Sequence, residues 1–211
     1  NIENNIVYNN SEVSVATGGK QILYNAFQAT VNKGDEIIIP SPYWVSYPDM
    51  VILAQGSPVF VATKKENNFK ITVDMLEKVI SEKTKWIVLN SPSNPTGTCY
   101  SREELKEIGD LLKKYENILI MTDDIYEKIT YESFIFSTMA EVLPELKSRI
   151  LTVNGVSKAY SMTGWRIGYA GGPEFLIKSM AKIQSQSTSN PTSISQYAAV
   201  EALTSSNSFL N

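Results

Sequence analysis

Histidine is missing from the sequence altogether, although the chain has 211 residues. Its absence excludes a Ser-His-Asp triad, a Cys-His pair and any histidine-ligated metal site. Acid-base chemistry must therefore use lysine, aspartate, glutamate, tyrosine or cysteine. An activated lysine is the natural candidate among these.

Cysteine, long apolar runs and blocks of like charge are also scarce. The lone Cys99 excludes an internal disulfide and a multi-cysteine zinc site, and it fits a reducing cytoplasm. No apolar run approaches the roughly 20 residues that span a bilayer, and no signal peptide is recognisable. The formal charge of -3, without a long run of one sign, points to neither nucleic acid nor an anionic membrane as a partner.

Short apolar runs alternate with amphipathic segments along the chain. The runs that predict strands buried on both faces of a sheet are residues 36–39, 59–62, 86–90, 118–122, 150–153 and 167–170. Apolar residues at three- and four-residue spacing predict helices over residues 21–31, 73–80, 103–114 and 175–184. This alternation predicts an α/β protein, a three-layer α/β/α sandwich with a mostly parallel sheet.

In such a sheet ligands bind at the carboxyl ends of the strands, and five motifs fall at the ends of elements. Residues 17–20 (TGGK) precede a helix, where glycine amides and the helix dipole favour an anion, although a structural turn is the commoner explanation. Residues 41–44 (SPYW) follow a strand, and their aromatic rings can stack on a flat ligand or simply pack into the core.

Residues 90–97 (NSPSNPTG) follow the strand predicted at 86–90. Two X-Pro bonds and a glycine predict a defined loop that holds the Asn94 amide ready to bond a ligand, and a whole octet of this kind is hard to attribute to chance. Asp123 directly follows the strand predicted at 118–122 and opens the motif DDIY. A carboxylate there needs a partner, such as a protonated ring nitrogen, unless it caps the next helix.

The fifth motif, residues 157–168 (SKAYSMTGWRIG), follows the strand predicted at 150–153. Lys158 lies there in a stretch with few other charges, which is typical of a nucleophilic lysine rather than a surface one. Arg166, flanked by Gly164 and Gly168, offers a guanidinium fork suited to a phosphate.

These motifs, in this order and spacing, resemble the large domain of fold-type I pyridoxal-phosphate (PLP) enzymes, specifically class I aminotransferases of the aspartate aminotransferase type. PYWVSYP (42–48) and SQSTSNP (185–191) indicate the bacterial aspartate or prephenate subgroup, and the resemblance runs from about residue 13 to 203. It implies the fold of a PLP-dependent transferase and pyridoxal 5'-phosphate as cofactor. It also implies transfer of an amino group between an amino acid and a 2-oxo acid.

The resemblance further implies a role for each matching residue. Lys158 would form a Schiff base with the cofactor aldehyde and then shuttle a proton. Asp123 would pair with the ring nitrogen and keep it protonated, which makes the ring an electron sink. Asn94 and Tyr126 would hydrogen-bond the phenolic oxygen of the ring, and Asn94 would also contact the substrate.

The phosphate and the substrate side chain have their own predicted partners. Gly18, Gly19 and Lys20 would cradle the phosphate at a helix N-terminus, and Arg166 would neutralise it. Trp44 would stack on the ring and contact the substrate carboxylate. Lys20 would in addition read a distal carboxylate, which favours aspartate and glutamate as substrates.

Two features depart from the family pattern. Many relatives have a phosphate-binding serine three residues before the lysine, where this chain has Gly155. Relatives also hold the substrate α-carboxylate with an arginine from a C-terminal small domain. Of the three arginines here, Arg102 opens a predicted helix, Arg149 precedes a strand at the opposite edge and Arg166 faces the phosphate, so none fits that role.

We therefore expect residues 1–12 to be a lead-in segment and residues 13–204 to be the PLP-binding large domain. Residues 205–211 would start a connection to a C-terminal small domain that the chain lacks. Such a chain would have little or no activity by itself, whereas the full-length parent would be an active homodimer in the cytoplasm.

Three other functions stay open. Another PLP-dependent reaction on the same scaffold, such as an aromatic or alanine transamination or a β-lyase reaction, is compatible with motifs that identify the cofactor better than the substrate. A cofactor-binding module without turnover is the second. A generic phosphate-binding α/β domain is the third, and it leaves DDIY and SKAYSMTGWRIG unexplained.

Overall fold

A seven-stranded sheet in the order β1-β7-β6-β5-β4-β2-β3 forms the centre of the computed structural model, which describes residues 4–131 and 133–206. The strands are β1 Val13–Thr17, β2 Glu36–Ser41, β3 Ser57–Ala62, β4 Thr84–Asn90, β5 Leu119–Asp123, β6 Ile150–Gly155 and β7 Ile167–Gly171. Strands β2 to β6 pair in parallel, whereas β7 is antiparallel to both β1 and β6. The predicted α/β class with a mostly parallel sheet is confirmed.

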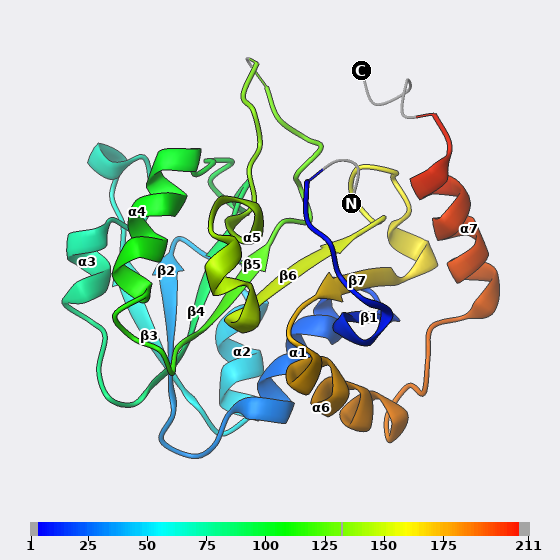
Figure 1. Ribbon diagram of the computed structural model, residues 1–211, viewed down its shortest axis with the longest axis horizontal. Helices are drawn as coiled ribbons and strands as arrows, with labels where there is room; N and C mark the ends of the chain where they lie inside the picture. Colours follow the sequence, from blue (N-terminus) through cyan, green and yellow to red (C-terminus); the bar gives the residue numbers. More distant parts are fainter. Residues whose placement is uncertain (1–3, 132, 207–211) are drawn as a thin grey trace.

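Helices cover both faces of this sheet (Figure 1). The α-helices are α1 Gly19–Thr30, α2 Ser46–Leu53, α3 Val73–Glu77, α4 Arg102–Leu112, α5 Met139–Val142, α6 Glu174–Ser185 and α7 Ser193–Thr204. Because side chains alternate across a strand, Ile37 and Ile39 pack with α1, α2 and α6, while Ile38 packs with α3, α4 and α5 on the other face. The two apolar cores make the predicted three-layer sandwich.

All six predicted strands and all four predicted helices are present, with ends shifted by at most three residues. The helix predicted from residue 21 begins at Gly19, so two residues of the TGGK motif belong to it. Ser101 caps α4, because its Oγ accepts a hydrogen bond from the Glu104 amide at 3.2 Å. The pattern missed β1, α2, α5 and α7, which are short or have a largely exposed side.

The strand directions bring the five motifs to one edge of the sheet. Strands β1, β2, β4, β5 and β6 all end at this edge, and the antiparallel β7 begins there. The loops after these strands therefore meet above the sheet, although they are far apart in the sequence.

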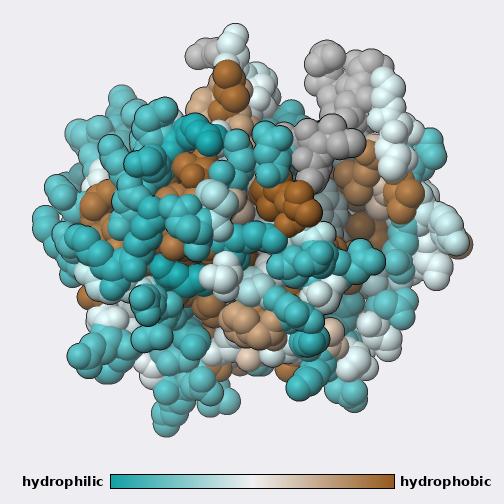
Figure 2. Space-filling view, viewed as in Figure 1, coloured by the Kyte–Doolittle hydropathy of each residue, from teal (hydrophilic) through white to brown (hydrophobic). Residues whose placement is uncertain are grey.

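The surface seen in Figure 2 is mostly hydrophilic, with apolar side chains in scattered patches. In the part of the chain that the structure describes, no helix is both long and apolar enough to cross a membrane. The segment boundaries expected after residues 12 and 204 stay predictions. Residues 1–3 of the lead-in segment and residues 207–211 of the connection lie outside the described residues.

Candidate active site

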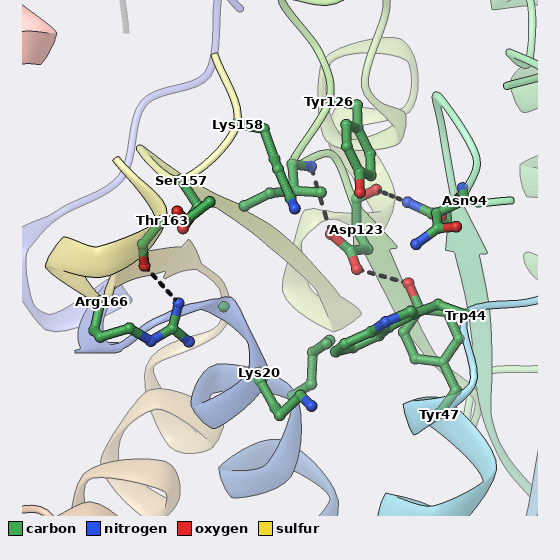
Figure 3. Close-up of a pocket in the computed structure, with 14 residues that line it drawn as sticks. Lys20, Trp44, Tyr47, Asn94, Asp123, Tyr126, Ser157, Lys158, Thr163 and Arg166 are labelled. Carbon is green, nitrogen blue, oxygen red and sulfur yellow. Dashed lines mark hydrogen bonds between the residues drawn. The ribbon is translucent and has the colours of Figure 1, made fainter. Parts of the chain in front are cut away.

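A cavity of about 180 Å³ lies at the edge where the strand ends meet (Figure 3). Eight of the nine predicted site residues line it: Gly19, Lys20, Trp44, Asn94, Asp123, Tyr126, Lys158 and Arg166. The ninth, Gly18, caps α1 directly behind the Arg166 guanidinium. The structure thus brings together residues from six different strand ends.

Asp123 is the buried charge of the cavity, with only 6% of its surface exposed. Its Oδ2 accepts a 2.6 Å hydrogen bond from the Tyr47 hydroxyl, and its Oδ1 accepts a long one of 3.4 Å from the Ile125 amide. Burial raises the pKa of the Asp123 carboxyl, and these two hydrogen bonds offset part of that rise. A cationic partner in the cavity would relieve the remaining desolvation.

The alternative in which Asp123 caps a following helix is wrong. Residues 125–128 form a turn, and the next α-helix after them in the chain begins at Met139. The carboxylate instead lines the cavity and lies beside the Tyr47 hydroxyl (Figure 3).

Tyr47 is a site residue that the sequence reasoning missed. It lies in the first turn of α2, is 2% exposed, and packs its ring edge-on against Trp44 with 5.3 Å between the centroids. The signal was present in PYWVSYP, because residues three apart share one side of a helical turn. The tyrosine thereby reaches the same cavity as Trp44.

For the transamination that the resemblance implies, we expect Tyr47→Phe to lower kcat/KM by about tenfold. The variant keeps the aromatic ring but loses the hydrogen bond to the Asp123 carboxylate. The pKa of Asp123 rises further without that donor. Steady-state kinetics over a pH series would measure both effects. Tyr43→Phe is the matched control, because the Tyr43 ring stacks on Phe60 and lies outside this cavity. Equal rates for the two variants would contradict a role for the Tyr47 hydroxyl.

Lys158 lies in the turn that follows β6, and its amine points into the cavity toward Asp123 (Figure 3). Its Nζ is 5.7 Å from the centroid of the Tyr126 ring. The side chain is also exposed to solvent, so the expectation of surroundings unlike the surface is wrong. The amine is open to a ligand that enters the cavity from outside.

Arg166 and the start of α1 form the other end of the cavity. Arg166 has a left-handed backbone with φ of 55°, and its Nη1 donates to the Thr163 carbonyl at 3.0 Å. Gly168 lets β7 approach α1, because a Cβ there would collide with the backbone of Gly18 and Gly19. The first amides of an α-helix have no acceptor one full turn earlier, so the start of α1 and the Arg166 guanidinium could together hold an anion.

Gly18→Ala should weaken the binding of pyridoxal 5'-phosphate, the cofactor that the resemblance implies, by at least about tenfold. Its φ is +85°, and a Cβ would collide with the Arg166 guanidinium. Titration of the cofactor's absorbance would give the dissociation constant. Gly34→Ala is the matched control, because φ is +96° there but the space around a Cβ is open. Equal weakening in both variants would assign the effect to backbone strain rather than to the anion site.

Lys20 and Trp44 stand beside each other at the mouth of the cavity. The Lys20 Nζ lies 4.9 Å from the centroid of the Trp44 ring, and its side chain is exposed. The Trp44 ring lines the cavity and also packs partly against the apolar core, so its structural role is confirmed, whereas stacking on a ligand stays a prediction.

The other two arginines are occupied outside the cavity. Arg102 pairs with Glu141 at 2.8 Å, and Arg149 donates to three main-chain carbonyls at the end where β6 begins. Gly155, where many relatives have serine, has no room for a side chain. A Cβ there would lie 2.9 Å from the Ile167 carbonyl oxygen and 3.0 Å from Ile125 Cδ1.

Asp124 is a second buried carboxylate, and it does not line the cavity. Burial raises its pKa well above the usual value, so the folded protein holds this proton more tightly than the unfolded chain. The stability that this proton contributes is full below about pH 4, the unfolded pKa of aspartate, and is lost as the pH rises.

We therefore expect Asp124→Asn to be more stable than the wild type at neutral pH, by about 1 kcal/mol or more, and nearly equal to it near pH 4. Urea unfolding at the two pH values would measure the difference. Lower stability at neutral pH would mean that the carboxylate is ionised and well compensated.

The chain was compared with known proteins. Residues 2–211 match the family described as aminotransferase class I and II. A probable aspartate/prephenate aminotransferase of Rickettsia bellii is 63% identical over 201 residues, 95% of this chain and 50% of that protein. An aspartate/prephenate aminotransferase of Cereibacter sphaeroides is 58% identical, over 99% of this chain and 52% of its own.

The structural comparison agrees with the sequence match. The crystal structure of the Rhizobium meliloti aspartate aminotransferase superposes with a TM-score of 0.98 at 51% identity, over 99% of this chain and 52% of that one. The chain spans about half the length of each of these relatives. It belongs to the class I and II aminotransferase family, whose cofactor is pyridoxal 5'-phosphate.

Proposed function

We propose that the protein is a PLP-dependent aminotransferase that moves an amino group from an amino acid to a 2-oxo acid, with aspartate or glutamate as donor. The observation that carries this proposal is the pair of Lys158 and Asp123 in one cavity, an amine open to solvent and a buried carboxylate. The names of the related aspartate/prephenate aminotransferases support the dicarboxylic substrate.

The residues around the cavity fit pyridoxal 5'-phosphate. The buried Asp123 carboxyl, with its raised pKa, suits a protonated ring nitrogen. At the other end, Arg166 and the α1 amides suit the dianionic phosphate. When bound, the cofactor supplies an electron sink for the electrons released at the substrate α-carbon.

Each residue then has a defined task. Asp123 holds a proton on the ring nitrogen, while Asn94 and Tyr126 bind the ring oxygen. Lys158 would hold the cofactor through its aldehyde. Once the substrate amine takes that place, the freed Nζ would carry the proton from the substrate α-carbon to the cofactor carbon. Trp44 covers one face of the site and limits water access.

Two further parts of the proposal concern the substrate and the assembly. The exposed Lys20 amine beside Trp44 is suited to a distal carboxylate at the mouth of the cavity. The exposed apolar residues Ile194, Tyr197 and Val200 on one side of α7 support a homodimer. The cytoplasmic location and the low activity of the isolated chain stay predictions.

Assays of the full-length protein test this function. Aspartate, glutamate, alanine and phenylalanine would be offered as donors, with oxaloacetate, prephenate and pyruvate as acceptors, and the product amino acids measured. We expect turnover with dicarboxylic donors. Activity with alanine or phenylalanine alone would contradict aspartate as the donor but would still support an aminotransferase. Elimination products without amino-group transfer would favour a lyase instead.

A further inference from the structure

Asn90 is the last residue of β4 and the register partner of Asp123 at the end of β5. It is half-buried and lines the cavity. In the sequence it is the first residue of the NSPSNPTG motif, and no pattern there assigns its side chain a role of its own. Its side chain nevertheless lies between Asp123 at the end of β5 and the loop that carries Asn94.

Both ends of the Asn90 amide are used. Its Nδ2 donates to the main-chain carbonyl of Asp123 at 2.7 Å, and its Oδ1 accepts from the main-chain amide of Asn94, also at 2.7 Å. A carbonyl only accepts and an amide N–H only donates, so the side chain cannot be flipped. The two bonds hold Asn90 in a single orientation.

We propose that Asn90 is a positioning residue that fixes the distance between Asp123 and Asn94. This inference rests on the proposed function, in which Asp123 would bind the ring nitrogen and Asn94 the ring oxygen of one cofactor. Asn90 itself makes no step of the reaction, and it acts only through its two partners.

The rest of the loop explains why this link matters. Around Asn94 the loop is closed by a hydrogen bond from the Ser93 amide to the Thr98 carbonyl, at 2.9 Å. The other bond from this loop to Asp123 is the long one from the Ser91 amide to its carbonyl, at 3.3 Å. The Asn90 side chain therefore makes one short bond to Asp123 on β5 and one to Asn94 in the loop, and so links the two.

Few other side chains could do the same. Aspartate offers only acceptors and would keep the bond to Asn94 while losing the one to Asp123. Alanine loses both bonds. The pair Asn90→Ala and Asn90→Asp therefore separates the two halves of the link.

The first experiment measures hydrogen exchange of the Asn94 amide in the cofactor-free, full-length protein. In Asn90→Ala we expect exchange at least about tenfold faster, because the acceptor is gone. In Asn90→Asp the amide should keep protection close to that of the wild type. Asn67→Ala is the matched control, since the Asn67 side chain donates to the Met75 sulfur, away from the cavity.

The second experiment follows the visible absorbance of added pyridoxal 5'-phosphate over a pH series. We expect Asn90→Ala to bind pyridoxal 5'-phosphate about tenfold more weakly. We also expect the pH midpoint of the absorbance change to shift by about one pH unit, because the hydrogen bond from Asn94 to the ring oxygen would be weakened. A residue that only supports the fold would change the melting temperature without moving this midpoint.

The outcomes separate the two proposals. Unchanged Asn94 exchange in Asn90→Ala, or an unchanged midpoint, overturns the positioning role. If Asn90→Ala fails to fold, Asn90→Asp decides, and loss of Asn94 protection in that variant also overturns it. If Asn94 exchange is faster in Asn90→Ala but the wild-type protein binds no cofactor, the proposed function is overturned, whereas the link between Asp123 and Asn94 stands.

Discussion

Replacing Lys158 by alanine is expected to lower transamination by at least about 10⁴-fold, because the variant loses both the amine that binds the cofactor and the group that moves the α-proton. The cofactor should still bind through Arg166 and Asp123, so the visible absorbance should change in shape rather than vanish. Stopped-flow measurement of a single half-reaction with aspartate would quantify the loss. The fold should persist, since Lys158 is exposed.

A matched variant makes this result specific. Lys182→Ala removes an exposed lysine on α6, which does not line the cavity, and should retain wild-type activity. Added methylamine should restore part of the activity of Lys158→Ala, since it can enter the space that the side chain leaves. Residual activity within tenfold of the wild type would assign the covalent and proton-transfer roles to another residue.

Asp123→Asn is expected to lower kcat by about 10³-fold, because a neutral amide cannot hold a proton on the ring nitrogen. The melting temperature should stay the same or rise, since burial already raises the pKa of this carboxyl and its removal relieves a desolvation cost. Loss of activity with unchanged stability is the pattern of a functional rather than a structural carboxylate.

Asp124→Asn is the matched control for this pair of measurements. It removes the neighbouring carboxylate, which is equally buried but does not line the cavity, and should leave most of the activity. Similar losses in both variants would mean that the strand end as a whole, and not the Asp123 carboxylate, is what the reaction needs.

The strands and helices with strong apolar periodicity could be predicted from the sequence. The strand at 86–90 and the helix at 103–114 bury one or both faces in a core, and that burial is what the apolar pattern records. Strand β1 was not predicted, because it lies at the sheet edge, where Val13 and Val15 are exposed. Helix α2 escaped because it is short and contains Pro48.

The candidate site shows the same division. Lys158, Asp123 and Asn94 lie in motifs whose residue types and spacing indicate binding of a cofactor, and the structure brings them to one cavity. Tyr47 and Asn90 act through hydrogen bonds to partners 76 and 33 residues away. The spacing of Tyr47 from Trp44 indicates the cavity but not the bond to Asp123. The bonds of Tyr47 and Asn90 to Asp123 depend on the packing of α2 and on the register of β4 against β5, which no local pattern encodes.

The attachment point of the cofactor tests the central claim most directly. The full-length protein would be loaded with pyridoxal 5'-phosphate, reduced with borohydride, digested and analysed by mass spectrometry. The account predicts that the cofactor mass is found on the peptide that contains Lys158. Cofactor found on another lysine, such as Lys20, with Lys158 unmodified would contradict it.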